Sequence, residues 1–215
     1  MAEAQPAKRV RTAILISGRG SNMAALIAAA RDPAYPAEIV LVVSNRPDAP
    51  GLALALQAGV PAMAIDHRPF GGDRAAHEAA IDARLRQTDV EIVCLAGYLR
   101  LLTPFLVSAW RGRMLNIHPS LLPAFPGLDT HARALAAGVQ LHGCTVHFVT
   151  LELDSGPILA QAAVPVLPGD TAEVLADRVL AQEHLIYPMA LRNFAAGTAG
   201  APASPVAALR NPAGP

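Results

Sequence analysis

The chain has 215 residues, and its 17 Lys and Arg balance 17 Asp and Glu, so its formal charge is zero and its pI is near 7.1. A neutral chain with 53% apolar residues fits one globular domain and disfavours nucleic-acid partners, which need a surplus of Lys and Arg. Because no apolar run approaches the roughly 18 to 20 residues that span a bilayer and the N-terminus does not resemble a signal peptide, we expect a cytoplasmic protein with no membrane partner.

The first half of the chain alternates short apolar strands with helices. The expected elements are a strand at 12–17, a helix at 22–30, a strand at 38–44, a helix at 50–57, a strand at 61–65, a helix at 74–87 and a strand at 90–96. Apolar strands rich in β-branched residues and separated by helices indicate a parallel sheet covered on both faces.

The pattern changes in the second half. The expected elements are a strand at 114–117, a helix at 131–137, paired strands at 144–149 and 158–166, and a closing helix at 171–193. The prolines within 164–168 should end an edge strand. We predict the α/β class: a single-domain, Rossmann-like open sheet, mostly parallel with an antiparallel C-terminal portion, with helices on both faces. The expected domain covers 11–194, between a flexible lead at 1–10 and a disordered tail at 195–215.

Two cysteines and the oligomeric state complete the general picture. Cys94 and Cys144 each lie in an apolar, strand-like stretch, which favours packed, reduced thiols over a disulfide or a nucleophile. No stripe of residues marks an interface, so the sequence is compatible with a monomer or a homodimer.

The loop at 17–22, SGRGSN, joins a predicted strand to a predicted helix, at the edge where open α/β sheets bind ligands. Its glycines allow the backbone to approach an anion, and the amides at the helix start can hold a phosphate. Met23 replaces the third glycine of a dinucleotide fingerprint and there is no GK[ST] motif, so NAD binding and ATP hydrolysis are not supported, while Arg46 leaves NADP open. The alternative is a tight glycine turn without a ligand.

A second cluster lies at 115–125, LNIHPSLLPAF. Asn116 and His118 are two residues apart and share one face if the segment is extended, so that an amide and an imidazole point the same way. Pro119 and Pro123 restrict the loop that follows. The alternative is a hydrogen-bonded structural histidine. The histidines lack metal-ligand spacing, so we expect no metal.

A third cluster lies at 150–157, TLELDSGP, and places Asp154 in a turn. The residue could form a plain Asx turn. If it lies near His118, the pair would orient the imidazole and stabilise its protonated form. Both readings stay open, because the sequence does not give the distance.

Together these segments resemble the folate-dependent formyltransferase family. The resemblance runs from about 11 to 193 through ILISGRGSN, VVSNRPDAPGLALA, LAGYLRLLTP, LNIHPSLLPAFPGLDTHARAL, HGCTVHFVTLELDSGPILAQ and QEHLIYP. NIHPSLLP followed by LDSGP is typical of the whole family, and GRGSN favours the branch that formylates glycinamide ribonucleotide. The resemblance implies small-molecule substrates: 10-formyltetrahydrofolate would give its formyl group to the amine of N1-(5-phospho-D-ribosyl)glycinamide in purine biosynthesis.

The resemblance also implies roles for individual residues. Asn116, His118 and Asp154 match the family's catalytic residues. The residues that match the acceptor site are Gly20, Ser21 and Asn22 at the phosphate and Glu183 at the ribose. The residues that match the 10-formyltetrahydrofolate site are Arg74 near the tail, Leu99, Arg100, Leu101 and Leu102 around the pterin, and Asn116, Thr150, Leu151, Glu152, Leu153 and Asp154 beside it. Leu180 departs from the pattern, because some members have a Gln there that assists the ribose contact.

The reaction fits these residue types. Attack of the amine on the formyl carbon creates an oxyanion, to which Asn116 and a protonated His118 would donate, while Asp154 supports His118 and proton transfer. One alternative is a formyltetrahydrofolate hydrolase, against which the GRGSN loop and the expected lack of an N-terminal regulatory domain argue. Another is an inactive folate-binding relative. A methionyl-tRNA formyltransferase would need an RNA-binding domain after residue 193, where we expect none.

Overall fold

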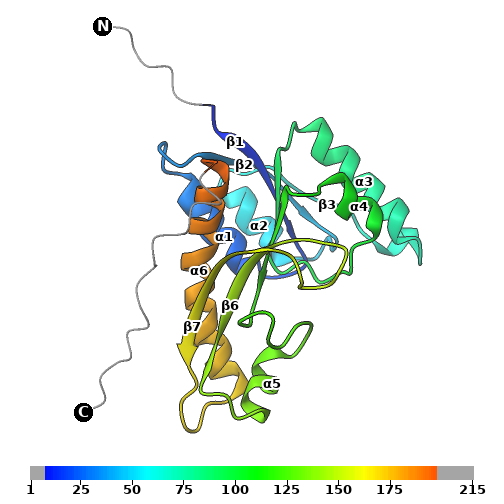
Figure 1. The fold of residues 1–215 in the computed structure, drawn as a ribbon. Helices are drawn as coiled ribbons and strands as arrows, with labels where there is room; N and C mark the ends of the chain where they lie inside the picture. Colours follow the sequence, from blue (N-terminus) through cyan, green and yellow to red (C-terminus); the bar gives the residue numbers. More distant parts are fainter. Residues whose placement is uncertain (1–7, 198–215) are drawn as a thin grey trace, which may run out of the picture.

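A computed structural model describes residues 8–197 as a seven-stranded sheet flanked by helices (Figure 1). The strands are β1 (Val10–Ile16), β2 (Ala37–Ser44), β3 (Ala62–Ala64), β4 (Ile92–Leu95), β5 (Met114–His118), β6 (Leu141–Phe148) and β7 (Ile158–Pro165). The helices are α1 (Ser21–Ala30), α2 (Pro50–Gln57), the 3-10 turn η1 (Arg68–Phe70), α3 (Arg74–Gln87), α4 (Pro104–Ala109), α5 (Thr130–Ala136) and α6 (Ala172–Ala195). Most of the predicted lead and tail, residues 1–7 and 198–215, lie outside the described residues.

The strand order is β3-β2-β1-β4-β5-β6-β7. The pairs β2–β3, β1–β2, β1–β4 and β4–β5 are parallel, because a helix or helical turn carries the chain back between these strands. The pairs β5–β6 and β6–β7 are antiparallel. The predicted fold class, including the antiparallel C-terminal portion and the edge strand that ends at Pro165, is confirmed.

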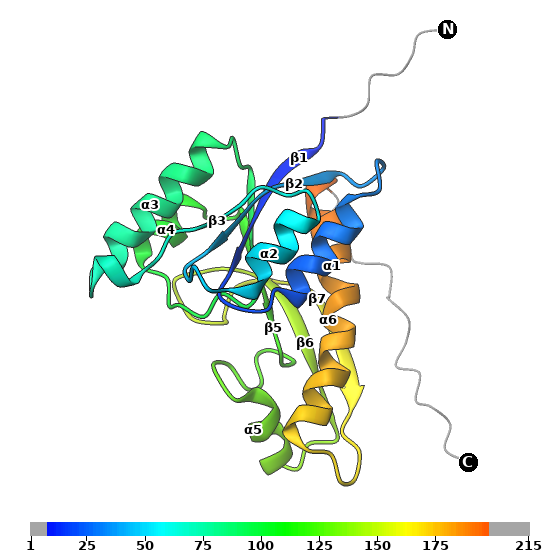
Figure 2. The same ribbon diagram turned by 180° about the vertical axis from the view of Figure 1, so that it is seen from behind.

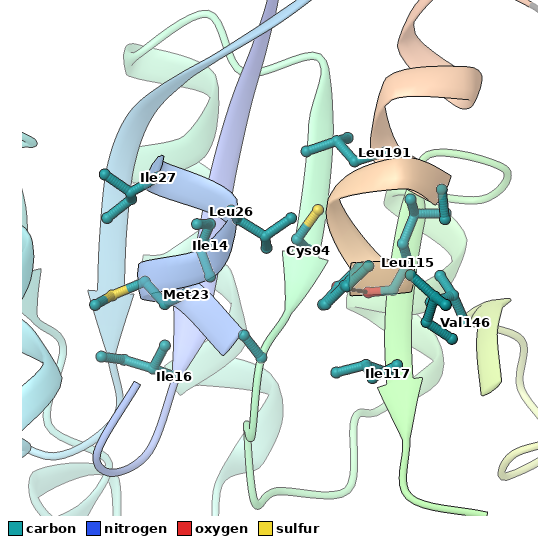
Figure 3. Packing of buried hydrophobic residues seen from close by; sticks show 14 of the residues in the cluster. Ile14, Ile16, Met23, Leu26, Ile27, Cys94, Leu115, Ile117, Val146 and Leu191 are labelled. Atoms are coloured by element: carbon teal, nitrogen blue, oxygen red, sulfur yellow. Dashed lines mark hydrogen bonds between the residues drawn. The ribbon is translucent and has the colours of Figure 1, made fainter. Parts of the chain in front are cut away.

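The sheet buries both of its faces. Along β1, Ile14 and Ile16 point to one face and pack with residues of α1 and α6, whereas Ala13 and Leu15 point to the other face, which α3 and α4 cover. Figures 1 and 2 show the two helical layers on opposite sides of the sheet. Figure 3 shows the buried side chains that pack on the face with Ile14 and Ile16. Helices on both faces are therefore confirmed.

The two cysteines are packed in this core. Cys94 and Cys144 are both free and buried, and burial raises the pKa of each thiol to about 12. The prediction of packed, reduced thiols is confirmed.

Two details differ from the sequence-based expectation. The helix α4 was not predicted, because six residues are too few to display helical periodicity. At the N-terminus, β1 begins at Val10 and the Arg9 side chain donates hydrogen bonds to the carbonyl oxygens of Tyr35 and Ala37, so the last residues of the expected lead are tied to the sheet. Within residues 8–197, no helix is long and apolar enough to cross a membrane.

Candidate active site

Asn116 and His118 lie next to each other on one face of β5. Leu115 and Ile117 point into the cluster beneath α6, so the alternation of the strand turns Asn116 and His118 to the opposite face, the one that Met114 shares with α3 and α4. The spacing of two residues therefore brings the amide and the imidazole together as expected.

Asp154 reaches the same place from the loop between β6 and β7. Its Oδ2 lies 3.4 Å from His118 Nδ1, and both side chains are 7% exposed. The backbone N–H of Gly127 donates to Asp154 Oδ2 at 2.8 Å, and His118 Nε2 lies 3.0 Å from the Phe125 carbonyl oxygen. Because a carbonyl only accepts, Nε2 carries a proton, and Nδ1 is the atom that faces the carboxylate.

His147 completes the cluster, and the sequence reasoning did not assign it a role in this site. It is the cross-strand partner of Asn116 on β6. Its Nδ1 lies 2.9 Å from the Phe148 carbonyl oxygen and therefore carries the proton, which leaves Nε2 to accept from Asn116 Nδ2 at 3.2 Å. The same Nε2 lies 3.8 Å from Asp154 Oδ1. Burial lowers the pKa of His147, so the neutral ring that this contact requires is favoured.

The arrangement fixes the Asn116 amide. One N–H of Asn116 Nδ2 donates to His147 Nε2. The second N–H of the same planar amide is directed away from His147. The cluster therefore combines an oriented amide donor, an imidazole and a carboxylate within hydrogen-bonding or ion-pairing distance of one another. The sequence predicted a strand at 144–149 paired with 158–166, but not its pairing with the strand of Asn116, so no sequence pattern singled out His147.

The glycine loop leads into α1. Gly20 has φ +76 and is the N-cap residue of this helix, a conformation that glycine adopts without strain. Asn22 Nδ2 donates to Glu183 Oε2 of α6 at 2.6 Å, and burial raises the pKa of that carboxyl group, while the hydrogen bond from Asn22 lowers it. The structure thus brings together Gly20, Ser21, Asn22 and Glu183, although Asn22 and Glu183 are 161 residues apart in the chain.

One atom of this group lacks a partner. Asn22 Oδ1 is buried and accepts no hydrogen bond within the described part of the chain. Buried acceptors are satisfied in most folded proteins, so an orphaned oxygen beside a helix N-terminus is a position where a ligand donor would be stabilised.

Exposed leucines line the loops after β4 and β6. Leu99 is 76% exposed, and Leu101, Leu151 and Leu153 are also exposed, whereas Leu102 packs against the core beneath α3 and α4. Both views show the β6–β7 loop running below the α3–α4 pair (Figures 1 and 2). Apolar side chains left open to solvent on loops beside buried polar groups are typical of a ligand site.

The remaining predicted donor-site residues lie on the same loops or on α3. Arg74 is the exposed first residue of α3. One turn along that helix, burial lowers the pKa of His77, and the charge of Arg100 lowers it further. Thr150 donates a hydrogen bond to the carbonyl oxygen of Glu152 at 3.0 Å, which shapes the start of the β6–β7 loop.

A separate hollow of about 290 Å³ lies after β2 and β3. It is lined by Arg46, Asp48, His67 and Arg68, and it contains none of the predicted catalytic residues. Its arginines are paired at 2.7 Å, Arg46 with Asp48 and Arg68 with Asp66, so it has no surplus charge. Among residues 8–197, no group of three or more His, Cys, Asp or Glu side chains is placed to hold a metal ion.

Comparison with known proteins agrees with this geometry. The formyl transferase family matches residues 10–191. The chain is 45% identical to phosphoribosylglycinamide formyltransferase of Escherichia coli over 86% of each chain. It is 58% identical to the crystal structure of phosphoribosylglycinamide formyltransferase from Brucella melitensis, with a TM-score of 0.84 over 88% of this chain and 97% of that one.

Two further relatives differ in length or in similarity. The bovine trifunctional purine biosynthetic protein adenosine-3 is 50% identical over 88% of this chain, which spans only 19% of that protein. A formyltetrahydrofolate deformylase from Pseudomonas syringae is 26% identical, with a TM-score of 0.82 over 89% of this chain and 63% of that one. The resemblance seen in the motifs is thus confirmed over most of the described residues, and the chain belongs to the formyl transferase family.

Proposed function

We propose that this protein is a phosphoribosylglycinamide formyltransferase. It transfers the formyl group of 10-formyltetrahydrofolate to the amine of N1-(5-phospho-D-ribosyl)glycinamide, giving the N-formyl product and tetrahydrofolate in de novo purine biosynthesis in the cytoplasm. The observation that carries the proposal is the approach of His118 Nδ1 to Asp154 Oδ2, at 3.4 Å, beside Asn116. The similarity to enzymes with this name along nearly their whole length supports it.

The acceptor site we propose begins at the N-terminus of α1. Backbone amides at Gly20, Ser21 and Asn22 would bind the phosphate, because they combine free N–H groups with the positive end of the helix dipole. Ribose hydroxyls would donate to the Glu183 carboxylate and to the unpartnered Asn22 Oδ1. Leu180 can accept no such hydrogen bond, so the ribose contact depends on the other two residues.

The donor site we propose lies between the two leucine-bearing loops. The pterin ring would cover apolar side chains of 99–102 and of 150–154, so that surface now exposed to water becomes buried. Arg74 would face the carboxylates of the folate tail, and Arg100 would lie with the other residues of 99–102 around the pterin. The reaction needs no metal in this scheme.

The catalytic residues would stabilise the negative charge that develops on the formyl oxygen when the amine attacks. A new C–N bond forms between the amine and the formyl carbon, and the carbonyl oxygen becomes negative. The free N–H of Asn116 and a proton on His118 Nδ1 would donate to this oxyanion, each donor contributing about 3 to 4 kcal/mol in comparable sites. Asp154 would stabilise the imidazolium and accept the amine proton, directly or through water. The carbonyl then re-forms as the C–N bond to the folate breaks, and the departing folate nitrogen takes up a proton, which balances the one that the amine lost.

A spectrophotometric assay tests the proposal. Release of tetrahydrofolate from 10-formyltetrahydrofolate is followed with and without phosphoribosylglycinamide. We expect release only when both substrates are present. Release that does not depend on the ribonucleotide would identify a hydrolase instead, and binding of the folate without release would identify an inactive relative.

A further inference from the structure

The buried hydroxyl of Ser17 lies between the glycine loop at 18–22 and the loop at 97–102. Ser17 directly follows β1 and is 3% exposed. Its Oγ donates a hydrogen bond to Asn45 Oδ1 at 2.6 Å, and it accepts one from the backbone N–H of Leu99 at 2.8 Å. Three loops, which follow β1, β2 and β4, therefore meet at one side-chain oxygen.

The direction of each hydrogen bond is determined by chemistry. An amide oxygen can only accept and a backbone N–H can only donate, so the Ser17 proton points at Asn45 and its lone pair points at Leu99. The backbone N–H of Ser17 also donates to the Gly97 carbonyl oxygen at 3.0 Å. Ser17 thus holds the segment 97–99 through both its main chain and its side chain.

The partner of Ser17 is itself buried and held in place. Asn45 is 3% exposed, and its backbone carbonyl oxygen lies 2.9 Å from Nδ1 of His67, which is in the loop after β3. The Ser17–Asn45 pair is therefore a fixed polar anchor within the described structure and not a mobile surface contact.

The loop at 97–102 is fixed by Tyr98, which is buried in the core beneath α3 and α4, and by this anchor, which holds the backbone of the next residue, Leu99. Leu99 and Leu101 are exposed, and Leu102 is the leucine of this loop that packs against the core. On the other side of Ser17, residues 18–22 start the glycine loop. The Ser17 hydroxyl therefore connects the backbone of the loop at 97–102 to the residue that directly precedes the glycine loop at 18–22.

We propose that Ser17, held by Asn45, is a positioning residue that keeps the loop at 97–102 in register with the glycine loop at 18–22. This inference rests on the proposed function, in which the first loop contacts the formyl donor and the second contacts the phosphate of the acceptor. Ser17 acts through the Leu99 amide and does not touch the reacting atoms.

Ser17→Ala tests the inference, because alanine removes the acceptor for the Leu99 N–H and so removes the side-chain contact that holds this part of the loop. We expect KM for 10-formyltetrahydrofolate to rise about tenfold, with KM for phosphoribosylglycinamide unchanged within about twofold. We also expect the Leu99 amide to exchange with solvent about tenfold faster, measured by NMR hydrogen exchange on the full chain without substrates.

Three further variants control for a general loss of stability. Thr12→Val removes another buried hydroxyl from β1, one that donates to the Val10 carbonyl oxygen at 3.2 Å and contacts neither loop, so both KM values and Leu99 exchange should stay unchanged. Ser17→Thr keeps the hydroxyl and should restore most of the donor affinity. If Ser17→Ala does not fold, Asn45→Ala should shift KM for the donor and Leu99 exchange in the same direction, by a smaller factor.

The outcomes separate this inference from the proposed function. Unchanged Leu99 exchange in folded Ser17→Ala, or an equal rise of both KM values, would overturn the positioning role. A wild-type protein that shows no transfer would contradict the proposed function, and Leu99 exchange, which needs no substrate, would still decide whether Ser17 holds the loop.

Discussion

At the scale of single residues, the cluster of Asn116, His118, His147 and Asp154 explains how a side-chain oxyanion site is oriented. Each imidazole has one nitrogen facing a backbone carbonyl, so its protonation on that side is fixed. The proposed chemistry depends on the second N–H of Asn116, which His147 does not engage, and on the Nδ1 of His118, which faces Asp154 Oδ2 at 3.4 Å.

His118→Ala and Asp154→Asn should each lower kcat at least 100-fold, because one removes a donor to the oxyanion and the other removes the charge that stabilises the imidazolium. Steady-state kinetics with both substrates measures the effect, and circular dichroism checks that the variants are folded. Wild-type turnover in either folded variant would rule out the assigned roles.

His147→Phe should lower kcat about tenfold and leave both KM values within about twofold, because the ring only orients the Asn116 amide. The split between kcat and KM distinguishes orientation of a catalytic group from loss of a substrate contact. A change confined to KM would show that His147 contacts a substrate instead.

The sequence predicted the shared face of Asn116 and His118, since alternation along a strand is local. It could not predict His147 or the approach of Asp154. The first depends on the register between β5 and β6, and the second depends on how a nine-residue segment, 149–157, folds over the neighbouring strand β5 that carries His118. Neither property is encoded in the spacing of residues.

At the scale of elements, the β6–β7 hairpin is what delivers Asp154. Gly156 closes this loop so tightly that a Cβ placed there would lie 1.8 Å from the Phe148 carbonyl oxygen. Asp154 itself has φ +50, an uncommon conformation for a residue other than glycine. The loop therefore has one backbone path that places the carboxylate beside His118.

Gly156→Ala should destabilise the protein by about 3 kcal/mol and lower kcat as well, because the backbone must shift where Asp154 is held. Urea unfolding and kinetics measure the two effects. Gly72→Ala is the matched control: a Cβ at this position meets nothing within 4 Å, so stability should change by less than about 0.5 kcal/mol. Equal stability of the two variants would show that the hairpin tolerates a different path.

Most elements could be predicted from the sequence because they are long or clearly bounded. The helix α3 begins and ends where the pattern placed it, with the Asp73 side chain accepting from the Ala76 N–H at its N-terminus. The helix α4 was missed because it is stabilised from outside itself: the buried Glu78 carboxylate of α3 accepts a hydrogen bond from the Thr103 N–H at 2.8 Å, directly before α4 begins. Support of that kind is tertiary and leaves no periodic pattern.

At the scale of the whole molecule, several buried histidines couple stability to pH. Burial lowers the pKa of His77, His131, His147 and His184, and it lowers the pKa of His142 to about 4. The unfolded chain therefore binds more protons than the folded chain between about pH 4 and the usual histidine pKa of about 6.5. Glu183, whose pKa is raised, acts in the opposite direction over part of this range.

The free energy of unfolding should consequently fall as the pH is lowered from 6.5 to 4, by roughly 1 kcal/mol per pH unit. Urea unfolding at a series of pH values measures this slope. His142→Gln should make the slope shallower, because it removes the histidine whose pKa burial lowers to about 4. A slope that is flat in the wild type, or identical in the variant, would contradict the link to buried histidines.

In the proposed reaction, the formyl carbon passes directly from the folate to the amine of phosphoribosylglycinamide. The most direct measurement uses 10-formyltetrahydrofolate labelled with ¹³C in the formyl group, incubated with the ribonucleotide and the enzyme and followed by NMR. We expect the label to appear in the amide of the N-formyl product. Label recovered as free formate, with the amine unmodified, would contradict it.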